Sequence, residues 1–256
     1  MEYQELMEGL AHQAGEVIRD NFLSHGKTEY KDDTSPVTIV DTTVNRMLIE
    51  RVKQRFPEHD VIGEEESDYE GDSEYTWVVD PVDGTIPYSA GIPVATFSLA
   101  LVHKGVPIAG VVYDPWIDRM WYAEKGEGAY LNEKRIHVNA ESDPSRMVMA
   151  VENWYYAPYQ LPLYDIFKNK GIKTFVLCSI IYPSCLVASG NFSGTVFPGI
   201  TCHDMAAVKI IVEEAGGKVT DLEGNEQRYD RPIKGAVVSN GVVHEMLLES
   251  ISEHDI

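Results

Sequence analysis

The segment 77–85 (WVVDPVDGT) limits the fold of this chain more than any other segment. Its apolar start predicts a short buried strand, and Pro81 predicts that this strand ends just after Asp80. Asp80 and Asp83 then lie at the turn that leaves the strand. A buried strand leading into a pair of acids is typical of a layered α and β protein, in which polar groups collect at the end of a strand.

Helices and antiparallel strands are expected in the first half of the chain. Apolar residues at helical spacing predict helices over 2–23 and 41–56, with a polar loop or hairpin over 24–35 between them. Apolar runs separated by glycine and proline predict consecutive antiparallel strands over 93–102, 108–113 and 119–123.

Strands and helices alternate after residue 141. Strands are expected over 173–177 and 236–239, and helices over 180–188 and 204–215, with a final helix that Asn240 caps and that runs to about residue 250. We therefore predict an N-terminal α+β lobe with an antiparallel sheet (1–143) and a C-terminal α/β lobe (144–256). A chain of 256 residues is long enough for two such lobes to share a core as one integrated unit.

The charge of the chain excludes some classes of partner. With 41 acids and 21 bases the formal net charge is −20, which argues against nucleic-acid polymers and anionic membranes. No stretch approaches the roughly 20 apolar residues that span a bilayer, and residues 1–10 do not predict a signal peptide. The three cysteines, Cys178, Cys185 and Cys202, fit neither a disulfide framework nor a zinc site, so we expect a cytoplasmic protein with reduced thiols.

The acids of the segment 80–85 predict a metal site beside an anion site. Two carboxylates leaving one strand can converge on a hard cation such as Mg²⁺, which prefers oxygen ligands. Gly84 lets the backbone approach a ligand, and the Gly84 and Thr85 amides can hold phosphate oxygens if a helix begins there. The alternative is a polar Asx turn without a ligand, and the acids nearby favour the functional interpretation.

Three further segments carry acids that could join this site. Glu64 begins an acidic run after the apolar pair 61–62, where a solvated acidic loop is the alternative. Asp41 and Asp204 each open a predicted helix. Because aspartate is a favoured N-cap and complements the helix dipole, spacing alone leaves both explanations open for these two residues.

Taken together, these motifs resemble the inositol monophosphatase family of Mg²⁺-dependent, lithium-sensitive phosphatases. The resemblance covers nearly the whole chain. It rests on the segments 63–65 (GEE), 80–85 (DPVDGT), 126–129 (GEGA) and 204–217 (DMAAVKIIVEEAGG), which stand in the family's order. It implies a layered α/β/α/β/α sandwich, a site between the two lobes, a homodimer, and hydrolysis of a small phosphorylated metabolite.

The resemblance also implies roles for individual residues. Glu64, Asp80 and the Val82 carbonyl would bind one Mg²⁺, and Asp80, Asp83 and Asp204 a second, with Glu64 sharing a third, weaker ion. Asp41 and Thr85 would orient and help deprotonate the attacking water, with Glu64 also counted among the catalytic residues. The Gly84 and Thr85 amides would hold the phosphate.

Two departures from the family pattern concern the substrate. Phe197 stands where inositol-specific members have an acid, seven residues before Asp204, and His203 replaces a usual tryptophan. A phenylalanine cannot accept a hydrogen bond from a hydroxyl, and an unpaired buried hydroxyl costs about 1–3 kcal/mol. We therefore predict that Phe197 and His203 contact a substrate other than myo-inositol 1-phosphate, and packing of Phe197 or a polar helix-start role for His203 are the alternatives.

The function expected from these features is Mg²⁺-dependent hydrolysis of a sugar or polyol phosphate. A nucleotide phosphatase acting on 3′-phosphoadenosine 5′-phosphate or NADP, a histidinol-phosphate phosphatase and a fructose bisphosphatase are alternatives within the same chemistry. A catalytically silent member that binds a ligand is the alternative from another class. Retention of the complete acidic set argues against it.

Overall fold

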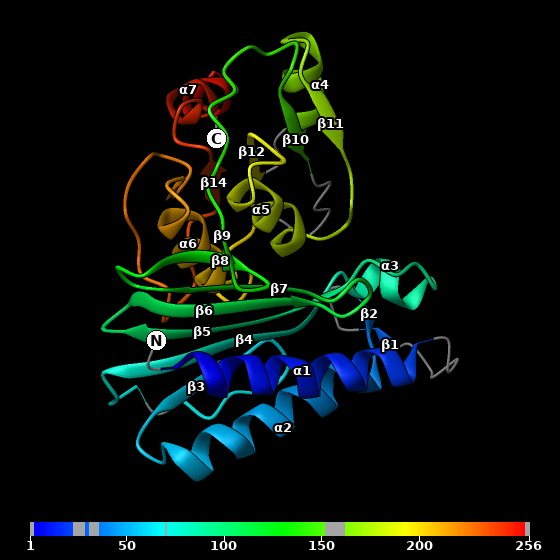
Figure 1. Cartoon of the computed structure of the whole chain (residues 1–256), viewed down its shortest axis with the longest axis vertical. Coiled ribbons are helices and arrows are strands. Elements are labelled where there is room, and N and C mark those ends of the chain that lie inside the picture. The colour runs from blue at the N-terminus through cyan, green and yellow to red at the C-terminus, as the bar shows by residue number, and fades with distance from the viewer. Residues whose placement is uncertain (1–2, 23–28, 31–35, 70, 152–161, 254–256) are drawn as a thin grey trace.

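The computed structural model describes residues 3–22, 29–30, 36–69, 71–151 and 162–253 (Figure 1). The first half contains α1 (Gln4–Asn21), β1 (Glu29–Tyr30), β2 (Pro36–Val37), α2 (Ile39–Arg55), β3 (Asp60–Gly63), β4 (Tyr75–Asp83), α3 (Thr85–Ser89), β5 (Thr96–His103), β6 (Val106–Asp114), β7 (Arg119–Glu124), β8 (Gly128–Leu131) and β9 (Lys134–Arg135). The second half contains β10 (Val148–Ala150), α4 (Leu163–Asn169), β11 (Lys173–Phe175), α5 (Ile181–Ala188), β12 (Gly194–Phe197), α6 (Ala206–Glu214), β13 (Lys218–Thr220), β14 (Ala236–Ser239) and α7 (His244–Ser252).

These elements form five layers, which confirms the predicted sandwich. Helices α1 and α2 cover one face of a seven-stranded sheet, and α5 and α6 lie between that sheet and a five-stranded one (Figure 1). Helices α4 and α7 lie on the far side of the second sheet (Figure 1). One hydrophobic cluster fills the space beneath α1 and α2, and a second joins the seven-stranded sheet to α5, α6 and β14.

The seven-stranded sheet runs in the order β3-β4-β5-β6-β7-β8-β9. The predicted antiparallel strands are confirmed, but β3 and β4 pair in parallel, which the sequence prediction did not include. The prediction that the strand ends at Pro81 is wrong, because β4 continues to Asp83. Its register against β5 shifts between Asp80 and Asp83, and such an irregularity accommodates the missing N–H of proline within a sheet.

The first residues of three helices also differ from those that the sequence predicted. Helix α2 begins at Ile39 with Thr38 as its cap, so Asp41 lies in the first turn instead of opening the helix. Helix α6 begins at Ala206, which leaves Asp204 in the preceding turn, and α7 begins at His244 with Val243 as its cap, although Asn240 was the predicted cap. The Asn240 side chain accepts from the Val242 and Val243 amides, 3.0 and 3.1 Å away, and so orders the turn before α7.

The two sheets occupy separate parts of the chain. The seven-stranded sheet ends at Arg135, and the five-stranded sheet, in the order β11-β10-β12-β14-β13, begins at Val148. The boundary between the two lobes near Asp143 stays a prediction. Helices α5 and α6 belong to the second half of the chain but pack against the first sheet, so the two halves share a core. Most of the predicted loop 24–35 lies outside the described residues; the rest of it includes β1, which pairs with β2. Within the described ranges, no helix is both long and apolar enough to cross a membrane.

A buried histidine makes the stability of the second sheet dependent on pH. His244 is fully buried, and its ring nitrogens lie 2.9 Å from Thr220 Oγ1 and 2.8 Å from Ser239 Oγ. Burial, with a smaller effect of Lys218, lowers the pKa of His244 from 6.5 to about 4. The folded state therefore needs neutral histidine, and this contribution to stability is present above pH 6.5 and lost as the pH falls toward 4.

We expect His244→Gln to reduce this pH dependence. Between pH 7 and 4.5 the wild type should lose about 2 kcal/mol more of its unfolding free energy than the variant, because glutamine does not titrate. Urea denaturation of both proteins at the two pH values measures this difference. Parallel losses would show that His244 is not the group responsible.

Candidate metal centre

Three buried aspartates meet at the end of β4. Asp80, Asp83 and Asp204 are each at most 5% exposed, and each offers a carboxylate oxygen within 4.8 Å of the others. Asp80 and Asp83 lie on either side of the irregularity in β4, and Asp204 comes from the turn before α6. The structure thus brings together three of the acids that the sequence singled out, from segments more than 120 residues apart.

The environment of Asp80 is strongly unfavourable for a carboxylate without a cation. Burial raises the pKa of Asp80 well above its usual range, and the negative charges of Glu64, Asp204, Asp83 and Asp41 raise it further. A bound cation would reverse this balance, because it would neutralise acids that now repel one another. The donor set consists of oxygens only, which fits Mg²⁺ and does not fit a soft metal.

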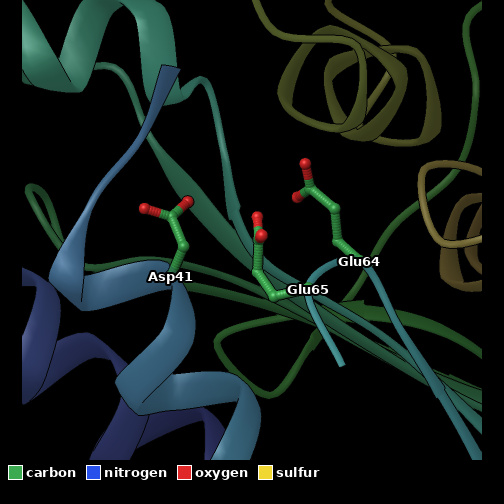
Figure 2. A group of neighbouring side chains, drawn as sticks. All are labelled: Asp41, Glu64 and Glu65. Carbon is green, nitrogen blue, oxygen red and sulfur yellow. The ribbon is translucent and has the colours of Figure 1, made fainter. Parts of the chain in front are cut away.

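A second acidic group adjoins the first. Asp41 from the first turn of α2, and Glu64 and Glu65 from the segment after β3, offer oxygens within 4.8 Å of one another. Figure 2 shows that their carboxylates reach into a common space. Burial raises the pKa of Asp41 to about 6, and Glu64 raises it in addition, whereas hydrogen bonds from Thr38 oppose the shift.

A hydrogen-bonded pair connects α2 to the segment after β4. Thr85 Oγ1 lies 3.2 Å from Asp41 Oδ1 and 2.9 Å from the Val82 carbonyl oxygen, so it can donate to either. The other Asp41 oxygen accepts from the Thr38 amide at 2.8 Å, which fixes the orientation of the carboxylate. Asp80 Oδ1 accepts from the Val82 amide at 3.0 Å. These contacts bring the predicted pair Asp41 and Thr85 together.

Gly84 occupies a position that other residues cannot easily fill. Its φ of 94° lies in the left-handed region, and a Cβ there would come within 2.5 Å of the Val94 carbonyl oxygen. Helix α3 begins directly after it, at Thr85, as the sequence required for an anion site at these amides. The glycine thus gives the backbone the turn that starts α3 at the edge of the acidic cluster.

Sequence reasoning missed the groups that hold Asp83. Its carboxylate accepts hydrogen bonds from Ser179 Oγ and from Thr96 Oγ1, the latter at 3.2 Å. Amides at the start of α5 donate to it as well, beginning with Ile180 at 3.0 Å. A serine just before a predicted helix was the available signal, since such residues cap helices, but nothing in the spacing identified Asp83 as its partner.

The two predicted substrate residues lie in different environments. Phe197 ends β12 with 0% exposure and packs in the core, so its substrate contact stays a prediction and packing is what the structure shows of it. His203 is largely buried, with Nε2 3.7 Å from Asp204 Oδ2. It therefore lies beside the metal centre, and its substrate contact stays a prediction.

One motif of the family pattern serves packing instead of the site. The Glu214 carboxylate, at the end of α6, accepts from the Gly126 and Gly128 amides at 2.7 and 2.8 Å. These bonds attach α6 to the turn between β7 and β8. The GEGA and EEAGG segments therefore fix the helix that follows Asp204.

Comparisons with known proteins agree with this geometry. A family model described as the inositol monophosphatase family matches residues 2–255. A fructose-1,6-bisphosphatase/inositol-1-monophosphatase of Thermotoga maritima is 32% identical over 227 residues, covering 89% of this chain and 85% of that protein. Nus factor SuhB of Pasteurella multocida is 33% identical over 221 residues, covering 84% and 83%. A solved structure of a T. maritima IMPase has a TM-score of 0.89 at 28% identity and covers 99% and 98% of the two chains.

Proposed function

Because the chain belongs to the inositol monophosphatase family, whose members are phosphoric monoester hydrolases, we propose that it hydrolyses a small sugar or polyol phosphate with the help of Mg²⁺. The observation that carries the proposal is the convergence of Asp80, Asp83 and Asp204 on one point, with Glu64 and Asp41 beside them. Family membership confirms the resemblance seen in the sequence.

The acids would hold two or three Mg²⁺ ions, through Glu64, Asp80, Asp83, Asp204 and the Val82 carbonyl. When bound, such ions lower the pKa of water and offset the negative charge that develops on a phosphate in the transition state. The protein itself holds these carboxylates in one orientation and excludes water from around them. Both properties follow from their burial on β4 and next to α6.

The remaining groups would act on water and phosphate. Asp41 and Thr85 form the pair that orients an attacking water, because the Thr85 hydroxyl reaches Asp41 and its carboxylate is held by Thr38. Glu64 lies next to this pair. The Gly84 and Thr85 amides would bind phosphate oxygens at the start of α3, where they need no reorganisation during the reaction.

The substrate we propose is a sugar or polyol phosphate. The name of the T. maritima relative gives both a fructose bisphosphatase and an inositol monophosphatase activity, which supports sugar phosphates and polyol phosphates as substrates. The apolar Phe197 argues against a dedicated hydroxyl acceptor at that position. Nucleotide, NADP and histidinol phosphates are alternatives for the same site. The Nus factor name belongs to the P. multocida relative, and the net charge of −20 argues against RNA binding here. We also propose that the protein is cytoplasmic, that lithium inhibits it and that it forms a homodimer.

Phosphate release from a panel of phosphate monoesters, assayed with Mg²⁺ and with EDTA, tests the proposed function. We expect release that requires Mg²⁺ and ceases in EDTA, and a higher melting temperature with Mg²⁺ than without, since a ligand that binds only the folded state stabilises it. Release that continues in EDTA would contradict the metal mechanism. Binding of Mg²⁺ without release from any substrate would favour the silent ligand-binding alternative.

A further inference from the structure

The Asp83 carboxylate is held from two directions. Thr96, which faces Asp83 across β4 and β5, donates to Oδ2 from the seven-stranded sheet. The start of α5 approaches from the opposite side of the site, where Ser179 Oγ and the Ile181 and Tyr182 amides donate to the same oxygen, the amides at 3.1 and 3.3 Å. Asp83 therefore connects two elements almost 100 residues apart.

The donors are distributed unequally between the two oxygens. From the part of the chain that the structure describes, Oδ2 receives all four of these hydrogen bonds, whereas Oδ1 receives one, from the Ile180 amide at 3.0 Å. A carboxylate has about four lone-pair positions in total, two on each oxygen. Oδ2 is thus saturated, and Oδ1 is the oxygen with capacity left for a cation.

Ser179 has a central place in this arrangement. Its hydroxyl donates to Asp83 Oδ2 and lies 3.3 Å from the Tyr182 amide, from which it accepts. Ser179 is buried, and Cys178 before it has a φ of 52°, in the left-handed region. The hydroxyl is therefore held between the helix start and the carboxylate, and among the described residues it is the one side-chain donor to Asp83 from the segment that leads into α5.

From this geometry we propose that Ser179 is a positioning residue: by occupying Oδ2, it turns the Asp83 carboxylate so that Oδ1 faces the metal centre. The inference rests on the proposed metal-binding function of Asp83. Because Ser179 lies just before α5, the packing of α5 on the first sheet would then set the orientation of Asp83, a metal ligand on β4. Groups that orient metal ligands in this way change metal affinity by about 10–100-fold when they are removed.

The test measures binding of Mn²⁺ alone to the metal-free protein, by electron paramagnetic resonance. Ser179→Ala should weaken Mn²⁺ binding about 10–100-fold, and Ser179→Thr, which keeps the hydroxyl, should stay within about threefold of the wild type. Ser184→Ala is the matched control, because Ser184 is a buried serine in α5, and its hydroxyl donates to the Ile180 carbonyl at 2.7 Å instead of to Asp83. It should bind Mn²⁺ like the wild type.

The possible results separate this inference from the proposed function. If Ser179→Ala binds Mn²⁺ as tightly as the wild type, or if Ser184→Ala weakens binding equally, the positioning role is overturned and the phosphatase proposal is unaffected. If the wild type itself binds no Mn²⁺, the proposed metal mechanism fails. Should Ser179→Ala not fold, Ser179→Cys keeps a side chain of similar shape with a much weaker donor, and unchanged Mn²⁺ binding in that variant would also overturn the inference.

Discussion

Replacing Asp80 with asparagine is expected to abolish Mg²⁺-dependent phosphate release and, at the same time, to stabilise the metal-free protein. Burial raises the pKa of Asp80, and four neighbouring acids raise it further, so its charged form is disfavoured in the absence of metal. Asparagine keeps the acceptor for the Val82 amide and removes the charge. Activity should fall by about 10³-fold or more, since a main source of charge stabilisation is lost.

Stability should change in the opposite direction. Without metal, relief of the repulsion is expected to raise the unfolding free energy by about 1–2 kcal/mol, or the melting temperature by about 2–6 °C. Thermal denaturation in EDTA and phosphate release in Mg²⁺ measure the two effects. Asp114→Asn is the matched control, because Asp114 is buried in β6 of the same sheet and also accepts the amide two residues ahead. A less stable, fully active Asp80→Asn protein would refute the assignment.

Gly84→Ala should damage both stability and catalysis. The new Cβ would meet the Val94 carbonyl oxygen at 2.5 Å, and this atom belongs to the backbone and cannot rotate away. Together with the cost of a left-handed φ for alanine, we expect a loss of about 2–4 kcal/mol in unfolding free energy. Any shift of this turn also displaces the amides that would bind phosphate, so kcat/KM should fall by at least about 10²-fold.

Gly171→Ala is the control that separates the cost of the contact with Val94 from the cost of a left-handed φ for alanine. Gly171 has a similar φ of 79°, but a Cβ there has no atom within 4 Å, so Gly171→Ala isolates the backbone cost. We expect a loss of about 1 kcal/mol with unchanged activity. Denaturant titration and steady-state kinetics of both variants give the comparison. Equal effects of Gly84→Ala and Gly171→Ala would mean that the contact with Val94 has no consequence.

Local patterns predicted the parts of the fold that depend on local physics. The amphipathic helix over 2–23 and the apolar strands of the first sheet were found because their periodicity reflects which face is buried. Helix starts were placed less well. Asp41 was taken as the residue that opens its helix, whereas Thr38 accepts from the Val40 amide and Asp41 completes the capping box.

Contacts between distant segments are the parts that sequence reasoning could not supply. The acids were identified by type and motif, and the family resemblance implied that Asp204 joins Asp80 and Asp83. Residue patterns alone could not show this, because it depends on the position of the turn before α6 relative to β4. The donors to Asp83 come from α5 and from β5, and neither had a functional signal of its own. The burial of Phe197 was likewise not evident from the sequence, because a family position does not show whether its side chain points into the core.

The position of β4 within the first sheet has a consequence for the timescale of metal exchange. The first part of this strand, residues 76–79, pairs with the edge strand β3 on one side and with β5 on the other, whereas its ladder with β5 is interrupted between Asp80 and Asp83. Amide hydrogens of residues 76–79 should therefore exchange with solvent more slowly than those of residues 80–83. Ions would then enter and leave through motion of the irregular end of β4 and its side chains, and the backbone of residues 76–79 should look the same with and without metal.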